Sequence, residues 1–322
     1  MSLPKIILFD LDETIVFSEE IKTKAWTDIL RVFGYCWEEE SNGKLISVPK
    51  DRRPKTGLSP YDYIENLIDS LELLTQSINL LEEDQSLEER EYRIKLDSLL
   101  PDQDKRKGMI QIMKDHWTSS LIAHAKLFAE EGRIREVPSA SDEIKRARQK
   151  GYRIGIITQA PVEYAKEVLS FLGLVDKHNE ENNVVDVVVS GDMVKKPKPD
   201  PESLVLATEL IIIQTAIEQT ETNLRKKLTV KERVNLERSI HQDYFSIGIV
   251  VPRPVAVIGD SRLDIEAVRH YPGTGRIQKI LINSRNLSSD EIRMIKPDLT
   301  INHFGELLPQ LEGNVSRKKE KR

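Results

Sequence analysis

An apolar stretch near the start of the chain runs directly into two acidic residues, and this feature limits the possible folds most. Residues 6–9 are apolar and partly β-branched, and Asp10 and Asp12 follow with a single leucine between them. A short apolar run of this kind is typical of a strand that is buried on both faces of a parallel sheet. Because such strands present chemistry at their carboxyl ends, Asp10 and Asp12 are candidate functional residues. A pair of solvated loop acids is the alternative interpretation.

Further short apolar stretches occur after residue 150 and alternate with helical patterns. The predicted strands are 153–158, 184–190, 255–258 and 279–282, and the predicted helices are 142–150 and 161–172. Strands that alternate with helices predict a parallel sheet with right-handed crossover connections. The strand at residues 6–9 is too short to stand alone, so we assign it to the same sheet. The predicted fold class is therefore α/β.

A long region with helical signals, residues 17–136, separates the first predicted strand from the others. Its helix-start signals include a capping box from Ser86 to Glu89. We therefore expect an α/β core formed by residues 1–16 and 137–322, with residues 17–136 inserted as a helical domain.

Residues 205–250 form a second predicted helical stretch, which interrupts the α/β pattern. Its apolar residues recur at a spacing of three and four: Leu206, Leu210, Ile213, Ile217 and Leu224. Thr229 and Glu232 have capping-box spacing, which predicts a second helix and hence a helical hairpin. The apolar stripe favours packing on the core, and a hairpin that forms a homodimer is the alternative. The polar part from Glu218 to Lys227 is expected to project into solvent.

Charge, cysteine content and hydropathy exclude several classes of function. The chain has 48 Lys and Arg against 53 Asp and Glu, a net charge of −5, which argues against non-specific binding to nucleic acid. Its one cysteine, Cys36, allows no intramolecular disulfide, as expected in a reducing compartment. The sequence has neither a signal-peptide pattern nor an apolar run near the ~18 residues that a membrane span requires. We therefore expect a cytoplasmic protein with no membrane partner.

Polar residues also follow the other predicted strands. Asp260 and Asp264 come after the strand at 255–258, Thr158 ends another strand, and Lys198 lies between two prolines before a helix. The carboxyl ends of parallel strands meet in one crevice, so these side chains are expected to converge. Carboxylates, a hydroxyl and a lysine suit phosphoryl transfer, because a metal and a lysine neutralise charge while a carboxylate attacks. Oxygen-only ligands favour Mg²⁺.

Together these motifs resemble the haloacid dehalogenase-like phosphatase superfamily. In chain order they are D-x-D-x-T at Asp10 to Thr14, a hydroxyl motif at Ile156 to Gln159, a lysine motif at Lys198 to Glu202, and G-D-x-x-x-D at Gly259 to Asp264. The resemblance covers residues 1–17 and about 138–300, and it leaves the helices of 205–250 unexplained. It implies a Rossmann-like parallel sheet core with an inserted all-helical cap domain of the C1 type. The similar group is that of phosphoglycolate phosphatase and β-phosphoglucomutase.

The resemblance also implies the roles of the transferring groups. Asp10 attacks phosphorus and forms an aspartyl-phosphate, while Asp12 protonates the leaving oxygen and then deprotonates the attacking water. Thr158 and Lys198 hold the transferring phosphoryl group. Lys196 also precedes a proline and is the alternative to Lys198.

A metal site is implied as well. In proteins of this superfamily Mg²⁺ is bound by side chains and one backbone carbonyl, which correspond here to the Asp10 side chain, the Asp12 carbonyl and Asp260. Asp264 and Thr14 are expected to support this site. The superfamily's dehalogenases and phosphonate-cleaving members lack the second aspartate, so Asp12 argues against both activities.

Substrate contacts are expected from the inserted domain and from the hydroxyl motif. Residues 55–59 resemble the cap loop of β-phosphoglucomutase-like proteins, so Arg52, Arg53 and Lys55 are candidate substrate-binding residues, together with Gln159. A solvated basic loop is the alternative. The predicted function is a Mg²⁺-dependent phosphomonoester hydrolase that acts on a small phosphorylated metabolite. A phosphomutase and a non-catalytic binding protein remain the alternatives, because the core motifs do not separate them.

Overall fold

The computed structural model consists of two compact units, formed by Met1–Ser18 with Ile134–Arg322 and by Glu19–Arg133. The residues that it describes are 4–32, 35–36, 46–47, 64, 103–179, 182–240, 254–272 and 277–312. Three candidate substrate-binding residues, Arg52, Arg53 and Lys55, lie outside this described part of the chain, as does the predicted capping box at residues 86–89.

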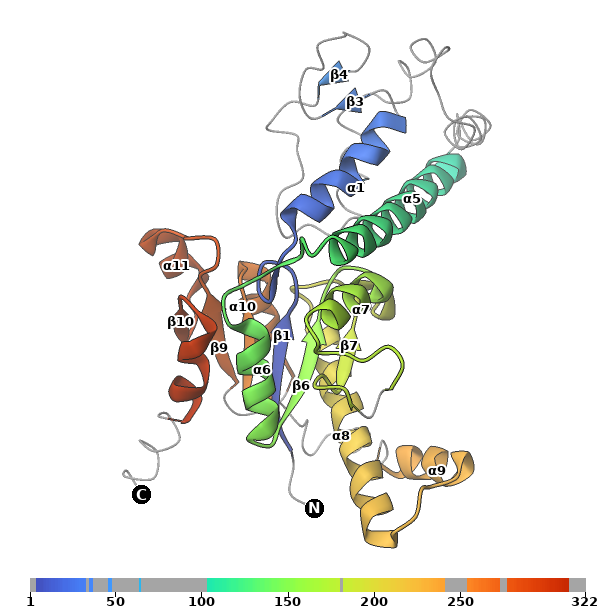
Figure 1. The fold of residues 1–322 in the computed structure, drawn as a ribbon, viewed down its shortest axis with the longest axis vertical. Helices are drawn as coiled ribbons and strands as arrows, with labels where there is room; N and C mark the ends of the chain where they lie inside the picture. Colours follow the sequence, from blue (N-terminus) through green and yellow to red (C-terminus); the bar gives the residue numbers. More distant parts are fainter. Residues whose placement is uncertain are drawn as a thin grey trace. The chain divides into compact units, whose positions relative to one another are not determined.

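The first unit is built on a six-stranded sheet with the strand order β10-β9-β8-β1-β6-β7 (Figure 1). The strands are β1 (Lys5–Asp10), β6 (Tyr152–Ile157), β7 (Val187–Val189), β8 (Ala256–Gly259), β9 (Gln278–Ile282) and β10 (Leu299–Ile301). Each paired neighbour in this sheet runs parallel. The α/β fold class predicted from the sequence is confirmed, and β1 lies at the centre between β6 and β8.

Helices cover both faces of this sheet. The helices of this unit are α6 (Ala140–Gln149), α7 (Val162–Phe171), α8 (Glu202–Leu224), α9 (Val230–Ile240), α10 (Arg262–Arg269) and α11 (Ser289–Ile295), with 3-10 turns η3 (Gly191–Met193) and η5 (Phe304–Glu306). Of these, α9 packs on α8 rather than on the sheet itself (Figure 1). Ile6 and Leu8 of β1 belong to the apolar cluster that α8 and α10 complete. Phe9 points the other way and stacks on Phe304, with 6.1 Å between ring centroids. Because successive side chains enter two buried layers, the strand is apolar without interruption.

Several elements differ from the prediction. The strand β7 is shorter than expected. At its start the Asp186 carboxylate, instead of a backbone carbonyl of β7, accepts the hydrogen bond from the Ile154 amide at 2.7 Å. Neither β10 nor α11 was predicted, and both are short. A two-stranded ribbon of β2 (Val16–Phe17) and β5 (Arg135–Glu136) was also missed. The strands β2, β5 and β10 have two or three residues and carry no hydrophobic period, so the apolar pattern does not reveal them.

The buried face of α8 differs from the predicted apolar stripe. Leu206, Leu210 and Ile213 are only partly buried against the core. The residues that face it directly are Leu204, Ala207, Thr208, Ile211, Ile212, Thr215 and Ala216. Two of these are threonines whose hydroxyls are satisfied within the helix, by the carbonyls of Leu204 and Ile211 at 2.7 Å. The buried face therefore mixes large apolar residues with alanines and threonines, and a count of apolar residues alone misplaces it.

The predicted helical hairpin is present as α8 and α9. Thr229 and Glu232 form the predicted capping box, in which the Thr229 amide donates to the Glu232 carboxylate at 2.8 Å. The expectation that residues 218–227 project into solvent is wrong at Glu218. Glu218 pairs with Arg153 of β6, and Ile240 at the end of α9 is 5% exposed within the core cluster. Both ends of the hairpin are therefore anchored on the core.

The second unit contains α1 (Glu19–Val32) and α5 (Gln103–Glu130). Trp26 of α1 packs on Trp117 of α5, with 5.5 Å between ring centroids. Asp28 accepts a hydrogen bond from Ser120 at 2.5 Å and contacts the ring of His124 at 2.8 Å, which adds a polar link between these helices. The unit also has a parallel pair of two-residue strands, β3 (Tyr35–Cys36) and β4 (Ile46–Ser47), which the all-helical prediction did not include.

Across the residues that the structure describes, no helix combines the length and the apolar character needed to cross a membrane.

Candidate active site

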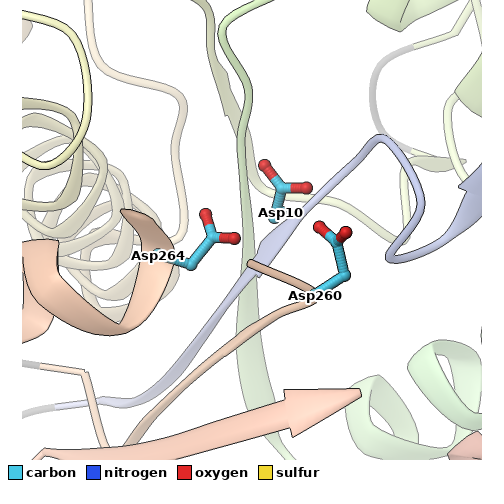
Figure 2. A group of neighbouring side chains, drawn as sticks. All are labelled: Asp10, Asp260 and Asp264. Carbon is cyan, nitrogen blue, oxygen red and sulfur yellow. The ribbon is translucent and has the colours of Figure 1, made fainter. Parts of the chain in front are cut away.

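Three buried carboxylates meet at the carboxyl edge of the central strands. Asp10 is the last residue of β1, Asp260 follows β8, and Asp264 lies in the first turn of α10. Figure 2 shows the three side chains pointing toward one another. One oxygen from each lies within 4.8 Å of the others. Three residues that are far apart in the sequence therefore form one acidic group.

Lys198 joins two members of this group. Its Nζ donates to Asp10 Oδ1 at 2.5 Å, to Asp264 Oδ1 at 2.7 Å and to the Ile157 carbonyl at 3.2 Å. Burial alone lowers the pKa of Lys198, but the two carboxylates outweigh burial and hold it above its usual value. Lys196, the alternative candidate, has a 73% exposed side chain that lies 3.8 Å from Asp200. The structure thus places Lys198, and not Lys196, among the carboxylates.

The start of α10 explains the spacing of the G-D-x-x-x-D motif. Ser261 and Asp264 form a capping box, in which Asp264 Oδ2 accepts the Ser261 amide at 3.2 Å and the Ser261 hydroxyl at 2.5 Å. A Cβ atom on Gly259 would lie 2.4 Å from Asp264 Cγ, so only glycine fits beside this carboxylate. Helix capping therefore fixes the position of Asp264. Ser261 donates to its Oδ2, and Lys198 donates to its Oδ1.

The acidic group carries more negative charge than its two neighbouring cations neutralise. Burial raises the pKa of Asp10 to about 7; Lys198 opposes the shift, and Asp264 and Asp12 add to it. Burial, Asp10 and Asp264 hold the pKa of Asp260 well above its usual range, although Arg285 opposes them. Buried like charges at this separation favour either protonation or the binding of a cation.

A divalent cation fits the oxygen atoms that remain. Asp260 Oδ2 is buried without a hydrogen bond, and Arg285 Nε approaches it to 2.8 Å as an ion pair but without hydrogen-bond geometry. The Thr14 hydroxyl lies 3.2 Å from Asp10 Oδ2 and 3.4 Å from Asp260 Oδ1, so it holds these two carboxylates together. Asp264 is held through both oxygens by Lys198 and Ser261 at 2.5–3.2 Å. Asp10 Oδ2 and Asp260 Oδ1 have only the longer contacts with Thr14, and Asp260 Oδ2 has no hydrogen bond, so these three oxygens offer ligand atoms for a cation. An all-oxygen donor set suits Mg²⁺.

Asp12 lies outside the three-carboxylate group. Its Oδ2 accepts from the Thr158 hydroxyl at 3.3 Å, and its Oδ1 accepts from the Tyr164 hydroxyl at 2.9 Å. The chain turns sharply after Asp12, where Glu13 has a φ of 60°. Burial, followed by the Asp12 charge, raises the pKa of Tyr164 well above its usual value, so its hydroxyl remains a donor. Asp10 and Asp12 therefore have separate partners and can take separate tasks.

Thr158 and Gln159 form a tight turn after β6. The Thr158 amide donates to the Val189 carbonyl at 2.9 Å, and the Thr158 hydroxyl accepts the Ala160 amide at 3.0 Å. A Cβ atom on Gly191 would lie 2.5 Å from the Gln159 carbonyl oxygen. Gly191 is thus required for the close approach of the loop after β7, which fixes the backbone of the predicted hydroxyl motif.

Sequence reasoning missed two polar residues after β9. Arg285 pairs with Asp260, and the Ser284 hydroxyl donates to the Glu13 carbonyl at 2.5 Å. Both residues follow a strand of the same sheet, so the signal that identified Asp10 and Asp260 applied to them too. Tyr164 was missed for a different reason. It lies in α7, where a tyrosine on the apolar face of a helix is interpreted as a residue of the hydrophobic core.

Comparisons with known proteins identify the family. Residues 4–215, more than half of the chain, match the family described as haloacid dehalogenase-like hydrolase. The chain belongs to this family.

Its relatives include several phosphatases. A phosphorylated carbohydrates phosphatase of Thermotoga maritima is 21% identical over 307 residues, which is 94% of this chain and 99% of that protein. A phosphoglycolate phosphatase of Cereibacter sphaeroides is 34% identical over 67 residues, or 21% of this chain. That match spans only 28% of the phosphoglycolate phosphatase.

Solved structures share the fold. CbbY from Rhodobacter sphaeroides, in complex with phosphate, has a TM-score of 0.54 at 18% identity, covering 95% of this chain and 96% of CbbY. A hydrolase from Pseudomonas syringae also has a TM-score of 0.54, at 16% identity, covering 96% of this chain and 98% of the hydrolase. At these identities the likeness concerns the fold alone.

Proposed function

We propose that this chain is a Mg²⁺-dependent phosphomonoester hydrolase that acts on a small phosphorylated metabolite. The observation that carries the proposal is the buried bridge from Lys198 to Asp10 and Asp264, beside an Asp260 oxygen that has no hydrogen bond. This arrangement offers a carboxylate nucleophile, a fixed positive charge and ligand atoms for a divalent cation. The names of the two phosphatase relatives support the same class of reaction.

Two carboxylates would divide the chemistry. Asp10 attacks phosphorus and forms an aspartyl-phosphate as the bond from phosphorus to the leaving oxygen breaks, and Asp12 gives its proton to that oxygen. A water molecule then attacks phosphorus, returns its proton to Asp12 and releases phosphate from Asp10. Lys198 and Thr158 hold the oxygens of the transferring group. Their contacts with Asp10 and Asp12 keep both carboxylates beside the transferring group.

The metal would be held by the side chains of Asp10 and Asp260 and by the backbone carbonyl of Asp12. When bound, Mg²⁺ neutralises charge on the phosphoryl group and on the carboxylates. Asp264 supports the site by holding Lys198, and Thr14 supports it by bridging Asp10 and Asp260.

The substrate class is proposed from the relatives and from the inserted region. Phosphoglycolate and phosphorylated carbohydrates are the substrate classes in the relatives' names. Residues 17–136 would act as the cap that excludes water, with Arg52, Arg53, Lys55 and Gln159 as candidate contacts to the substrate. A cytoplasmic location and a homodimer through residues 205–250 belong to the same proposal.

Phosphate release from a panel of phosphoglycolate, sugar phosphates and nucleotides tests the proposal. We expect steady release that requires Mg²⁺, stops on exhaustive chelation and is inhibited by Ca²⁺, whose looser coordination can draw both Asp10 oxygens onto the ion. Activity that survives chelation would contradict the metal role. Interconversion of phosphosugar isomers without net release would identify a phosphomutase instead, and no turnover of any kind would support a binding protein.

A further inference from the structure

Tyr164 makes a contact with Asp12 that no recognised motif explains. Its side chain is fully buried in α7, and its hydroxyl donates to Asp12 Oδ1 at 2.9 Å. The other oxygen of the same carboxylate, Oδ2, accepts from Thr158 at 3.3 Å. Two donors on two oxygens fix the orientation of the Asp12 carboxylate. The hydrogen bond from Tyr164 is the shorter of the two, and a phenol is a stronger donor than an aliphatic hydroxyl.

The two donors differ in how freely they can turn. A phenol O–H stays close to the plane of its ring, and the ring of Tyr164 is enclosed on all sides. The Thr158 hydroxyl rotates about a single bond, and its oxygen already accepts the Ala160 amide at 3.0 Å. Tyr164 is therefore a permanent donor to Oδ1, whereas Thr158 can release Oδ2 and turn to another acceptor. The proton that Asp12 carries then belongs on Oδ2.

The Tyr164 hydroxyl has a second polar neighbour besides Asp12, the Ser18 hydroxyl, which opposes the rise in the pKa of Tyr164. The Ser18 hydroxyl donates to Glu13 Oε1 at 3.3 Å. The Ser18 amide donates to Glu13 Oε1 at 2.8 Å. Glu13 is buried and has a φ of 60°, a conformation that costs a non-glycine residue free energy. Packing and hydrogen bonds therefore stabilise an otherwise unfavourable turn at Glu13, and this turn places the Glu13 carboxylate beside Ser18.

We propose that Tyr164 is a positioning residue that holds Asp12 with Oδ2 as the proton-carrying oxygen, and this inference rests on the proposed phosphatase function. As the bond from Asp10 to phosphorus forms and the bond to the leaving oxygen breaks, the proton moves from Asp12 Oδ2 to that oxygen. Tyr164 then stabilises the resulting carboxylate through Oδ1. In the second step Oδ2 takes back a proton from the water that displaces Asp10. Tyr164 touches neither substrate nor metal and acts only through Asp12.

Leaving-group dependence separates this role from a structural one. An alkyl phosphate needs a proton on its leaving oxygen, whereas the nitrophenolate of p-nitrophenyl phosphate leaves without one. Because kcat/KM reports on steps up to release of the alcohol, hydrolysis of the phosphoenzyme does not affect it. For Tyr164→Phe we expect kcat/KM for an alkyl phosphate to fall about 10- to 100-fold and kcat/KM for p-nitrophenyl phosphate to change less than about threefold.

Matched variants complete the experiment. Tyr152→Phe removes a phenol from β6, away from Asp12, and should leave both kcat/KM values unchanged. Circular dichroism and the urea midpoint report whether Tyr164→Phe folds. If it does not fold, Ser18→Ala, which removes the Ser18 hydroxyl beside the phenol, takes its place. This variant should also lose more kcat/KM on the alkyl phosphate than on p-nitrophenyl phosphate, by a smaller factor. Equal losses on the two substrates, or no loss on either, would overturn the inference. Wild-type protein that releases phosphate from neither substrate would overturn the proposed function, and the inference with it, before any variant is compared.

Discussion

Charged residues gather in two regions of the first unit, the acidic group at the sheet edge and the hairpin of α8 and α9, and the two gatherings differ in burial. At the sheet edge the Lys198 side chain is 4% exposed and that of Asp264 2% exposed. In the hairpin Lys226 and Glu232 pair at 2.9 Å, with 55% and 41% of their side chains exposed. Exposed pairs contribute little because water solvates each partner almost as well. Charge density by itself therefore does not mark a functional site, whereas buried like charges do.

The largest effect is expected from changing Asp10, the proposed nucleophile, in the buried acidic group. Asp10→Asn keeps the shape of the side chain and an oxygen for Lys198 but removes the carboxylate that is proposed to attack phosphorus. We expect turnover to fall by on the order of 10⁴-fold or more, with an unchanged circular dichroism spectrum. A well-folded Asp10→Asn protein with substantial phosphatase activity would show that another group attacks phosphorus.

Two lysine substitutions compare the regions directly. Lys198→Met leaves two buried carboxylates without their shared cation, and removing one partner of a buried ion pair costs about 3 kcal/mol of unfolding free energy. Lys226→Met removes a solvated partner and should leave the urea midpoint unchanged. Both variants are measured without metal, because a bound cation would stabilise the Lys198→Met site. Equal midpoints for the two variants would mean that the carboxylate group does not depend on Lys198.

Deletions in the hairpin of α8 and α9 test how much of it the core needs for stability and activity. Glu221 and Arg233 pair at 2.7 Å, so the residues that flank the tip lie side by side. Replacing residues 222–232 with a short Gly/Ser linker should cost about 1 kcal/mol or less and leave the phosphatase activity unchanged. As a control, deleting residues 218–243 also removes Glu218 and Ile240, and it should destabilise by about 2–4 kcal/mol through loss of core burial. Equal stability of the two deletions would contradict the anchoring role of these residues.

The same trimmed protein tests the proposed homodimer. Light scattering of the full chain and of the variant lacking residues 222–232 gives their masses in solution. If the hairpin joins two copies, the trimmed protein becomes monomeric and keeps its metal-dependent activity. A full-length protein that is already monomeric would remove the dimer from the proposal.

The smallest effect is expected at the turn between the two helices. Arg225 ends α8 in the left-handed region with a φ of 51°. Glycine adopts this conformation without a steric penalty, so Arg225→Gly should raise the free energy of unfolding by about 0.5 kcal/mol. Gln214→Gly, at an exposed position inside the same helix, should lower it by about 1 kcal/mol. A destabilising Arg225→Gly would show that the arginine side chain contributes more than its backbone conformation costs.

Local pattern was sufficient for the strands that run through the middle of the sheet. The strands β1, β6, β8 and β9 are largely buried, so each contains a short apolar run that a short window detects. The candidate residues at their carboxyl ends could be named for the same reason, since parallel strands bring those ends together. Even the spacing of Asp260 and Asp264 follows from a local rule, because a capping box sets it.

The partners of those residues were decided only by tertiary packing. Lys198 is 188 residues from Asp10, and Tyr164 is 152 residues from Asp12, so no local pattern records either contact. The buried face of α8 likewise depends on which side chains fit against the sheet, and it includes alanines and threonines that a count of apolar residues leaves out. Sequence alone thus determined where the central strands lie along the chain and which candidate residues follow them, because secondary structure and motif spacing are local. The tertiary structure decided which groups share protons and charge, because those interactions act through space across a low-dielectric core.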